Sequence, residues 1–271
     1  LEERALQYKK SFIFKMNSDI QNLRGMACIL ENIQPENIGE LLSSLWDASQ
    51  MMGFVRLAYF AQDGESIQLT AEGQITAIQA DEEAAEMQYA IQQALDGNFY
   101  CSQAFYDSVL GYNTMGYTTP VYMDGSISGV LACEVSTETY AGILSATGSV
   151  SNIGAAAVLN HDGKVLASTR THQIHGFYDL DGSAYLTDEM RSQLHKALLI
   201  DKTQFFEFNM RGLTLYACVM PMEIYPGKIV IVDTDAGISD AVSGVVHYAH
   251  MIGILFGVTS LIFVMSVLYI N

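Results

Sequence analysis

The feature that most limits how this chain can fold is an uncharged apolar run near its C-terminal end, Met251–Ile270, with the sequence MIGILFGVTSLIFVMSVLYI. A helix of this length and composition crosses a hydrocarbon core of about 30 Å. The alternative is a buried core helix, but uncharged runs this long are rare in soluble folds. The position of the run excludes a signal peptide. We therefore predict a transmembrane helix over residues 247–271, preceded by about 250 residues in water.

The distribution of charge indicates on which side of the membrane these residues lie. Asp233, Asp235 and Asp240 precede the run, and no Lys or Arg follows Lys228. Because positive residues prefer the cytoplasmic side, we expect residues 1–246 to be extracytoplasmic at the cell membrane. The net charge of −17 argues against nucleic acid as a partner. The chain begins without Met and ends just after the run, so we expect it to be part of a longer protein.

The first 34 residues have the pattern of a long helix. Two series of residues recur every seven positions and are apolar except for Lys9: Leu6, Ile13, Ile20 and Ala27, and Lys9, Met16, Leu23 and Leu30. Two interpretations are open. The helix packs on its own chain, or it also pairs with a second copy to form a homodimer. Because Lys9 interrupts the pattern and the heptads cover only four repeats, we expect weak pairing that needs the membrane helices.

Residues 35–145 alternate helix and strand patterns in the order helix, two strands, helix, three strands. The same order recurs over residues 146–245. Three landmarks keep nearly one offset between the two segments: Asp63-Gly64 and Asp162-Gly163, Met87 and Met190, and Gly125 and Gly227. The sequence therefore predicts an α+β fold with a long N-terminal helix (1–34), a duplicated module and a C-terminal transmembrane helix.

The stretch TTPVYMDGSISGVLACEVS, residues 118–136, carries a family resemblance together with the strand–Asp-Gly–strand hairpins. It resembles the pattern PV-x-x-(D)-G-x-x-x-GV-x-x-x-D that ends the first module of double Cache domains. These are tandem PAS-like extracytoplasmic sensors of bacterial transmembrane receptors. The resemblance implies two PAS-like antiparallel-sheet modules, of which the membrane-distal one (35–145) binds a small molecule. It also implies a cytoplasmic histidine kinase, diguanylate cyclase or chemoreceptor output, and the sequence does not select among them.

Signatures of catalysis are missing from the sequence. GSISG at 125–129 has Ile127 where a nucleophile elbow needs Ser, and neither a P-loop nor an HExxH motif occurs. We therefore expect a non-enzymatic region without a cofactor. One segment combines possible metal ligands: His172, His175, Asp179 and Asp181. Its turn residues favour a polar surface loop, so we predict no metal site there.

The four cysteines are Cys28, Cys101, Cys133 and Cys218, and they form neither a CxxC pair nor a zinc spacing. An oxidising exterior permits disulfides, whereas the apolar neighbours of these residues favour buried thiols. The sequence leaves the choice open.

Glu134 is the main candidate for a ligand contact. Because side chains alternate along a strand, Glu134 shares a face with Val130 and Ala132. In the double Cache family an Asp at this position often holds the amine of a bound amino acid, which implies an amine-bearing or cationic ligand here. The family's amine-binding version also has an Arg-Trp motif that this sequence lacks. Trp46, the single Trp, is interpreted as a core residue.

Further candidates precede Glu134 on the chain: Tyr106, Asp107, Tyr112 and Tyr117. Aromatic rings and a few polar groups line small-ligand sites, although Tyr is equally common in strands as packing. Arg56, within FVRLAYF, is a candidate either for a ligand carboxylate or for a salt bridge with Glu134.

These observations favour the ligand-sensing region of a bacterial transmembrane receptor, which relays binding through its membrane helix. The alternative is a membrane-anchored adhesion or assembly module without a small-molecule ligand. In that case its own Tyr and Phe side chains would fill the pocket.

Overall fold

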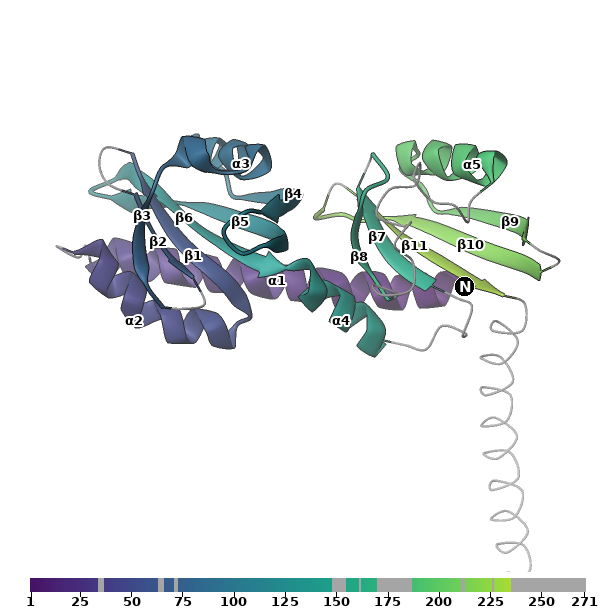
Figure 1. Cartoon of the computed structure of the whole chain (residues 1–271), viewed down its shortest axis with the longest axis horizontal. Helices are drawn as coiled ribbons and strands as arrows, with labels where there is room; N and C mark the ends of the chain where they lie inside the picture. Colours follow the sequence, from purple (N-terminus) through teal and green to yellow (C-terminus); the bar gives the residue numbers. More distant parts are fainter. Residues whose placement is uncertain are drawn as a thin grey trace, which may run out of the picture.

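The computed structural model describes residues 1–33, 37–62, 66–70, 73–147, 155–160, 162–169, 187–210, 213–225 and 227–234. These residues form the predicted α+β fold, with a long N-terminal helix and two antiparallel sheets (Figure 1). We call the part with the first sheet, from α2 to β6, the first module, and the part from β7 to β11 the second module.

The first module is a six-stranded sheet with helices on both faces. Its elements are α2 (Ile38–Met51), β1 (Phe54–Ala61), β2 (Ser66–Thr70), β3 (Ile75–Ile78), the short 3-10 helix η1 (Ala80–Glu82), α3 (Ala85–Leu95), β4 (Tyr100–Asp107), β5 (Tyr112–Met123) and β6 (Ser126–Ser136). The strand order is β3-β2-β1-β6-β5-β4, and paired neighbours are antiparallel. The order of helices and strands along the chain agrees with the sequence-based prediction except for β3, whose largely exposed residues give no alternating apolar pattern.

The second module repeats this topology with five strands. Its elements are α4 (Thr137–Thr147), which leads into it, then β7 (Ala155–Asn160), β8 (Val165–Ser168), α5 (Asp188–Leu199), β9 (Gln204–Met210), β10 (Leu213–Pro221) and β11 (Gly227–Thr234). The order β8-β7-β11-β10-β9 corresponds strand by strand to β2-β1-β6-β5-β4. Helices α3 and α5 cover the same side of their sheets (Figure 1). The two strand orders agree with the predicted duplication.

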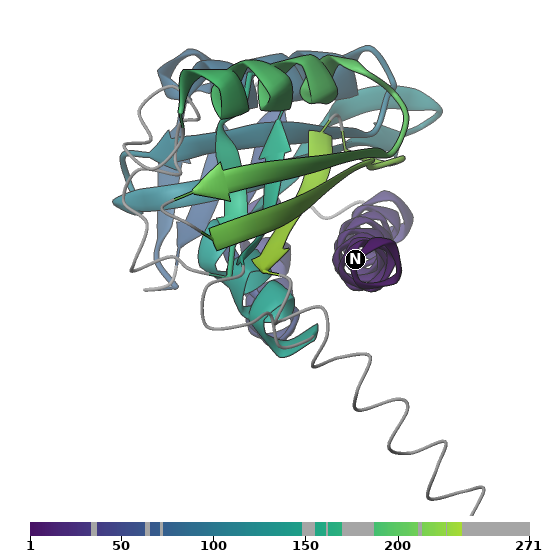
Figure 2. The ribbon, with the colours of Figure 1, turned by 90° about the vertical axis from the view of Figure 1, so that its right-hand side faces the viewer.

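Helix α1 (Glu2–Ile33) runs along both sheets on the side opposite α3 and α5, as the view along its axis shows (Figure 2). Its buried apolar residues join both modules in one core: Ala5, Tyr8, Phe12, Met16, Ile20, Leu23, Met26, Ala27 and Leu30. Near one end, Arg4 pairs with Asp233 of β11 at 2.7 Å. Near the other, Glu31 accepts a hydrogen bond from the Tyr122 backbone N–H at 3.1 Å. The helix therefore packs on its own chain, and pairing with a second copy stays a prediction.

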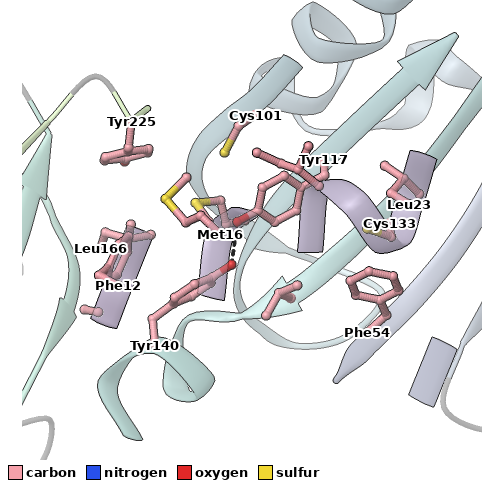
Figure 3. Packing of buried hydrophobic residues seen from close by; sticks show 14 of the residues in the cluster. Phe12, Met16, Leu23, Phe54, Cys101, Tyr117, Cys133, Tyr140, Leu166 and Tyr225 are labelled. Carbon is pink, nitrogen blue, oxygen red and sulfur yellow. Dashed lines mark hydrogen bonds between the residues drawn. The ribbon is translucent and has the colours of Figure 1, made fainter. Parts of the chain in front are cut away.

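A buried polar chain attaches α1 to α4 and to the first sheet. Asp19 is fully buried and pairs with Lys15. The Tyr140 hydroxyl donates to Asp19 at 2.9 Å, and a further hydrogen bond joins Tyr140 to Tyr117 of β5 (Figure 3). Burial raises the pKa of Asp19, while Lys15 and Tyr140 lower it. Because a buried charge is costly without such partners, these hydrogen-bonded side chains favour one arrangement of α1, α4 and β5.

All four thiols are free, which answers the question that the sequence left open. Cys101, Cys133 and Cys218 are buried, and Cys28 is exposed on α1. Burial raises the pKa of the three buried cysteines and keeps them protonated. They are packing residues, as their apolar neighbours in the sequence favoured.

Some predictions concern residues outside the described part of the chain. These are the membrane helix over 247–271 and the segment 171–182 with its two histidines. Among the residues that the structure does describe, no helix is both long and apolar enough to cross a membrane. No group of three His, Cys, Asp or Glu is placed there to hold a metal ion either.

Two glycines occupy equivalent places in the two modules. Gly129 lies where β6 begins to pair with β1, and Gly227 lies where β11 begins to pair with β7. A Cβ atom at Gly129 would lie 2.5 Å from the Phe60 carbonyl oxygen, and one at Gly227 would lie 2.4 Å from that of Leu159. The strand register thus matches Gly227 with Gly129, not with Gly125 as the sequence offset indicated.

We expect Gly129→Ala and Gly227→Ala each to lower the free energy of unfolding by about 1–3 kcal/mol, because the added methyl group meets a paired backbone carbonyl. Denaturant titration of the 271-residue chain measures this change. Gly142→Ala in α4 is the matched control, since a Cβ there meets nothing within 4 Å. It should leave stability unchanged or raise it slightly. Equal stability of all three variants would contradict the close strand approach.

Candidate ligand-binding site

The face of the first sheet that α3 covers carries the charged residues singled out in the sequence. On β6, Glu134 lies on this face with Ala132 and Val130, as the strand period predicts. Arg56 on β1 is its partner in the strand register. The pleat of two central strands therefore directs a carboxylate and a guanidinium into the same space beneath α3.

Arg56 is the centre of a buried charge cluster. Its Nη1 donates to Glu134 Oε1 at 2.8 Å and to Asp107 Oδ2 at 3.0 Å. Its Nε donates to Gln68 Oε1 at 2.6 Å. Glu83 binds the guanidinium through both carboxylate oxygens, one of them 2.9 Å from Nη1. Of the two interpretations for Arg56, the structure shows the salt bridge with Glu134.

The cluster sets the carboxyl groups of Glu83, Asp107 and Glu134 against one guanidinium. Burial raises the pKa of Glu134 to about 8; Arg56 opposes this rise and Asp107 adds to it. Burial also acts to lower the pKa of Arg56, but the surrounding carboxylates outweigh it and raise that pKa, so the guanidinium stays charged. The cluster therefore holds a proton at neutral pH and still carries excess negative charge.

A cavity of about 250 Å³ opens beside the cluster, next to η1 and the start of α3. Its polar lining consists mainly of Arg56, Gln68, Glu82, Glu83, Asp107 and Tyr106. Glu134 is not part of this lining. It borders a separate narrow gap against Met87 that has no room for a water molecule. A ligand in the cavity would therefore meet the other acids before Glu134.

The three predicted tyrosines lie in different environments. Tyr106 lines the cavity and is 61% exposed. Tyr112 is 37% exposed, and its pKa is raised by burial and further by the nearby Glu134 and Asp107 carboxylates. Tyr117 is fully buried on the opposite face, where it is hydrogen-bonded to α4 (Figure 3). The structure brings Tyr106, but not Tyr117, to the cavity.

Sequence reasoning missed three members of the site, Glu82, Glu83 and Gln68. The acids stand in the run ADEEAAE, and acidic residues are common at the start of a helix without any role in binding. Gln68 pairs with Ala58 across the β1–β2 hairpin, which places it beside Arg56. The register of the hairpin was the sequence signal that could have placed Gln68 beside Arg56. The contact between Arg56 and Glu83 had no such signal, because it depends on how α3 packs over the sheet.

No family model and no curated protein sequence matches this chain. Several solved structures are similar to it in fold. The sensory domain of the Campylobacter jejuni chemoreceptor Tlp3, with isoleucine bound, has a TM-score of 0.66 and 14% identity, covering 88% of this chain and 92% of that one. The ligand-binding domain of the Pseudomonas aeruginosa chemoreceptor PctB, in complex with L-Arg, has a TM-score of 0.55 and 14% identity, with coverages of 87% and 94%.

The extracellular domain of the histidine kinase mmHK1S-Z3 is a third similar structure, with a TM-score of 0.63 and 14% identity, covering 88% of this chain and 98% of that one. At such identities the likeness concerns the fold. The chain therefore has the fold of the sensory domains of chemoreceptors and histidine kinases, in agreement with the double Cache architecture that its sequence resembles.

Proposed function

We propose that this chain is the ligand-sensing region of a bacterial transmembrane signalling receptor, of histidine kinase, diguanylate cyclase or chemoreceptor type. The first module, residues 35–145, would be membrane-distal and bind a small cationic or amine-bearing molecule. The helix over Met251–Ile270 would anchor the chain in the cell membrane and relay the signal, with residues 1–246 outside the cytoplasm. The observation that carries this proposal is the acid-rich cluster beside a cavity of about 250 Å³.

The excess of carboxylates favours a cationic ligand group. Arg56 balances one of the three acids it contacts, and Glu82 adds a further acid to the cavity wall. A bound ammonium group would compensate this charge in surroundings where charges interact more strongly than in water. The exposed Tyr106 ring offers a cation–π contact at the mouth of the cavity. A ligand with only a carboxylate would have to displace Glu83 from Arg56.

The similar solved domains support amino acids as the first compounds to test. Structures of this fold hold isoleucine, L-valine and L-Arg, each of which carries an α-amino group. The cationic nitrogen is the part of these molecules for which the cavity of this chain has charge complementarity.

A route for the signal starts at Glu83, which lies between η1 and α3 and is bound to the central strand through Arg56. A cationic ligand would compete with Arg56 for this carboxylate and so change how α3 is held on the sheet. A ligand shifts a conformational equilibrium only by binding one state better, and this competition provides such a difference. Helix α1 contacts the same sheet through the Asp19–Tyr140–Tyr117 chain.

We expect amines and amino acids to raise the melting temperature of the 271-residue chain, while carboxylic acids without an amine leave it unchanged. A ligand present at about 100 times its Kd adds roughly 2.7 kcal/mol of stability. A thermal-shift screen against amines, amino acids and carboxylic acids measures this. A shift produced by simple carboxylic acids alone would contradict a cation-binding site.

For an amine found in this way, Glu82→Gln should weaken affinity by about 2- to 5-fold, because solvent screens this exposed charge. Glu83→Gln should weaken it by about 10-fold or more, because Glu83 is buried in the cluster. Glu138→Gln, an exposed acid on α4 outside the cavity, is the control. Titration calorimetry measures all three, and unchanged affinity in the two cavity variants would place the ligand elsewhere.

The raised pKa of Glu134 predicts a pH dependence of stability without ligand. Because the folded chain holds this proton up to about pH 8 and the unfolded chain releases it near 4.5, the stabilisation is complete at low pH and is lost as the pH rises through about 8. Glu134→Gln imitates the protonated form. The free energy of unfolding of this variant, relative to that of the wild type, should rise by on the order of 2 kcal/mol from about pH 6 to about pH 9. Denaturant titrations at constant ionic strength test this, and a pH-independent difference would refute it.

The second candidate function is a membrane-anchored adhesion or assembly module without a small-molecule ligand. One observation favours it: the chain's own guanidinium already occupies the centre of the acid cluster. This candidate predicts that no compound in the thermal-shift screen stabilises the chain. Stabilisation by an amine that depends on Glu83 would exclude it.

A further inference from the structure

A second cavity, of about 270 Å³, lies between the two modules, and we call it the inter-module cavity. The first module contributes residues of α3, β4 and β5, and the second contributes residues of β7, β8 and the turn before β11. Close by, Asn160 of β7 donates from its side-chain nitrogen to Gln103 of β4 at 2.9 Å. The cavity shares Ala84, Phe105 and Tyr106 with the first cavity, but its charged residues are different.

Tyr225 lines this cavity with an unused hydroxyl group. Its side chain is 1% exposed and lies in the space between the modules (Figure 3). Burial raises the pKa of Tyr225 and the nearby Ala104 backbone acts to lower it, yet no hydrogen bond of ordinary geometry joins the hydroxyl to any described residue. A buried hydroxyl without a partner destabilises the folded chain, and native proteins rarely leave one. This hydroxyl is therefore a donor available to a bound molecule.

Two opposite charges border the same cavity. Lys164, just before β8, and Glu86 of α3 both line it, and neither forms an ion pair with another described residue. The rings of Phe105 and Tyr106, with the side chain of Leu166, provide apolar and aromatic walls. The lining thus combines one free cation, one free anion, aromatic faces and a buried hydroxyl donor.

We propose that the inter-module cavity is a second ligand site, which binds a small zwitterion carrying a carboxylate and a cationic nitrogen. The carboxylate would accept hydrogen bonds from the Tyr225 hydroxyl and the Lys164 ammonium group. The cationic nitrogen would lie near Glu86 and the Tyr106 ring, where charge attraction and cation–π contact both favour it. Glu86 would repel a ligand that carries only a negative charge, and Lys164 would repel one that carries only a positive charge. Neither charge alone therefore matches the lining.

Because the lining comes from both modules, a ligand here would stabilise one arrangement of the two modules. Its binding energy would favour that arrangement over any in which the cavity is open or absent. The site goes beyond the proposed sensing function, since it needs none of the acids that contact Arg56.

Titration calorimetry on the 271-residue chain tests the proposal with glycine betaine and glycine as zwitterions, and with acetate and tetramethylammonium as their separate charges. We expect at least one zwitterion to bind at least 10-fold more tightly than either separate charge. Tyr225→Phe should weaken that binding by about 10- to 100-fold, since it removes one hydrogen bond to a charged group. Lys164→Met should weaken it at least several-fold.

Two controls separate this site from the first cavity and from misfolding. Tyr122→Phe removes a hydroxyl outside the inter-module cavity and should leave the affinity of that cavity unchanged. Glu83→Gln should weaken only the binding at the first cavity, so zwitterion binding that persists in this variant belongs to the inter-module cavity. The Tyr225→Phe chain should melt at the wild-type temperature or slightly above it, because no hydrogen bond is lost. The proposal is overturned if neither zwitterion binds, if Tyr225→Phe binds as tightly as the wild type, or if Tyr225→Phe strongly lowers the melting temperature of the free chain.

Discussion

The burial of one face of α1 is the interaction on which the rest of the structure depends. This face packs against both sheets, so residues from the two modules share a single apolar cluster. The helix also carries Asp19, which would be a costly buried charge without Lys15 and Tyr140 beside it. Apolar burial therefore holds α1 on the sheets, and the polar chain favours one register among those that apolar packing alone would tolerate.

The charge cluster on the other face of the first sheet differs from the α1 contacts in that it is not explained by stability. Buried ion pairs contribute little net stability, because the cost of removing charges from water offsets their attraction. The arrangement of a single Arg56 among three carboxylates therefore fits the proposed ligand site better than a contribution to stability. The cavity beside it and the link to α3 through Glu83 are consistent with that interpretation. The inter-module cavity is also lined by polar groups that the fold does not pair with one another, namely its two charged side chains and the Tyr225 hydroxyl.

The duplication shows where sequence offsets stop being informative. The order of helices and strands along the chain was largely predictable because most elements have their own apolar period. The match of Gly125 with Gly227 was wrong, because loop lengths differ between the modules and only strand register identifies Gly129 as the equivalent residue. Strand β3 was missed because it is an exposed edge strand.

The sequence by itself determined the α+β class, the long helix and the face of the strand on which Glu134 lies. These follow from local periodicity, since a strand alternates with period two and a helix with 3.6. Tertiary structure decided which charges meet. Arg56 and Glu83 are 27 residues apart and come together because α3 packs over the sheet, while Tyr117 lies on the far face, one strand away from Glu134. Contacts between elements depend on packing geometry that no local pattern encodes, so the partners of Arg56, the two cavities and the unused hydroxyl of Tyr225 became visible only in the folded chain.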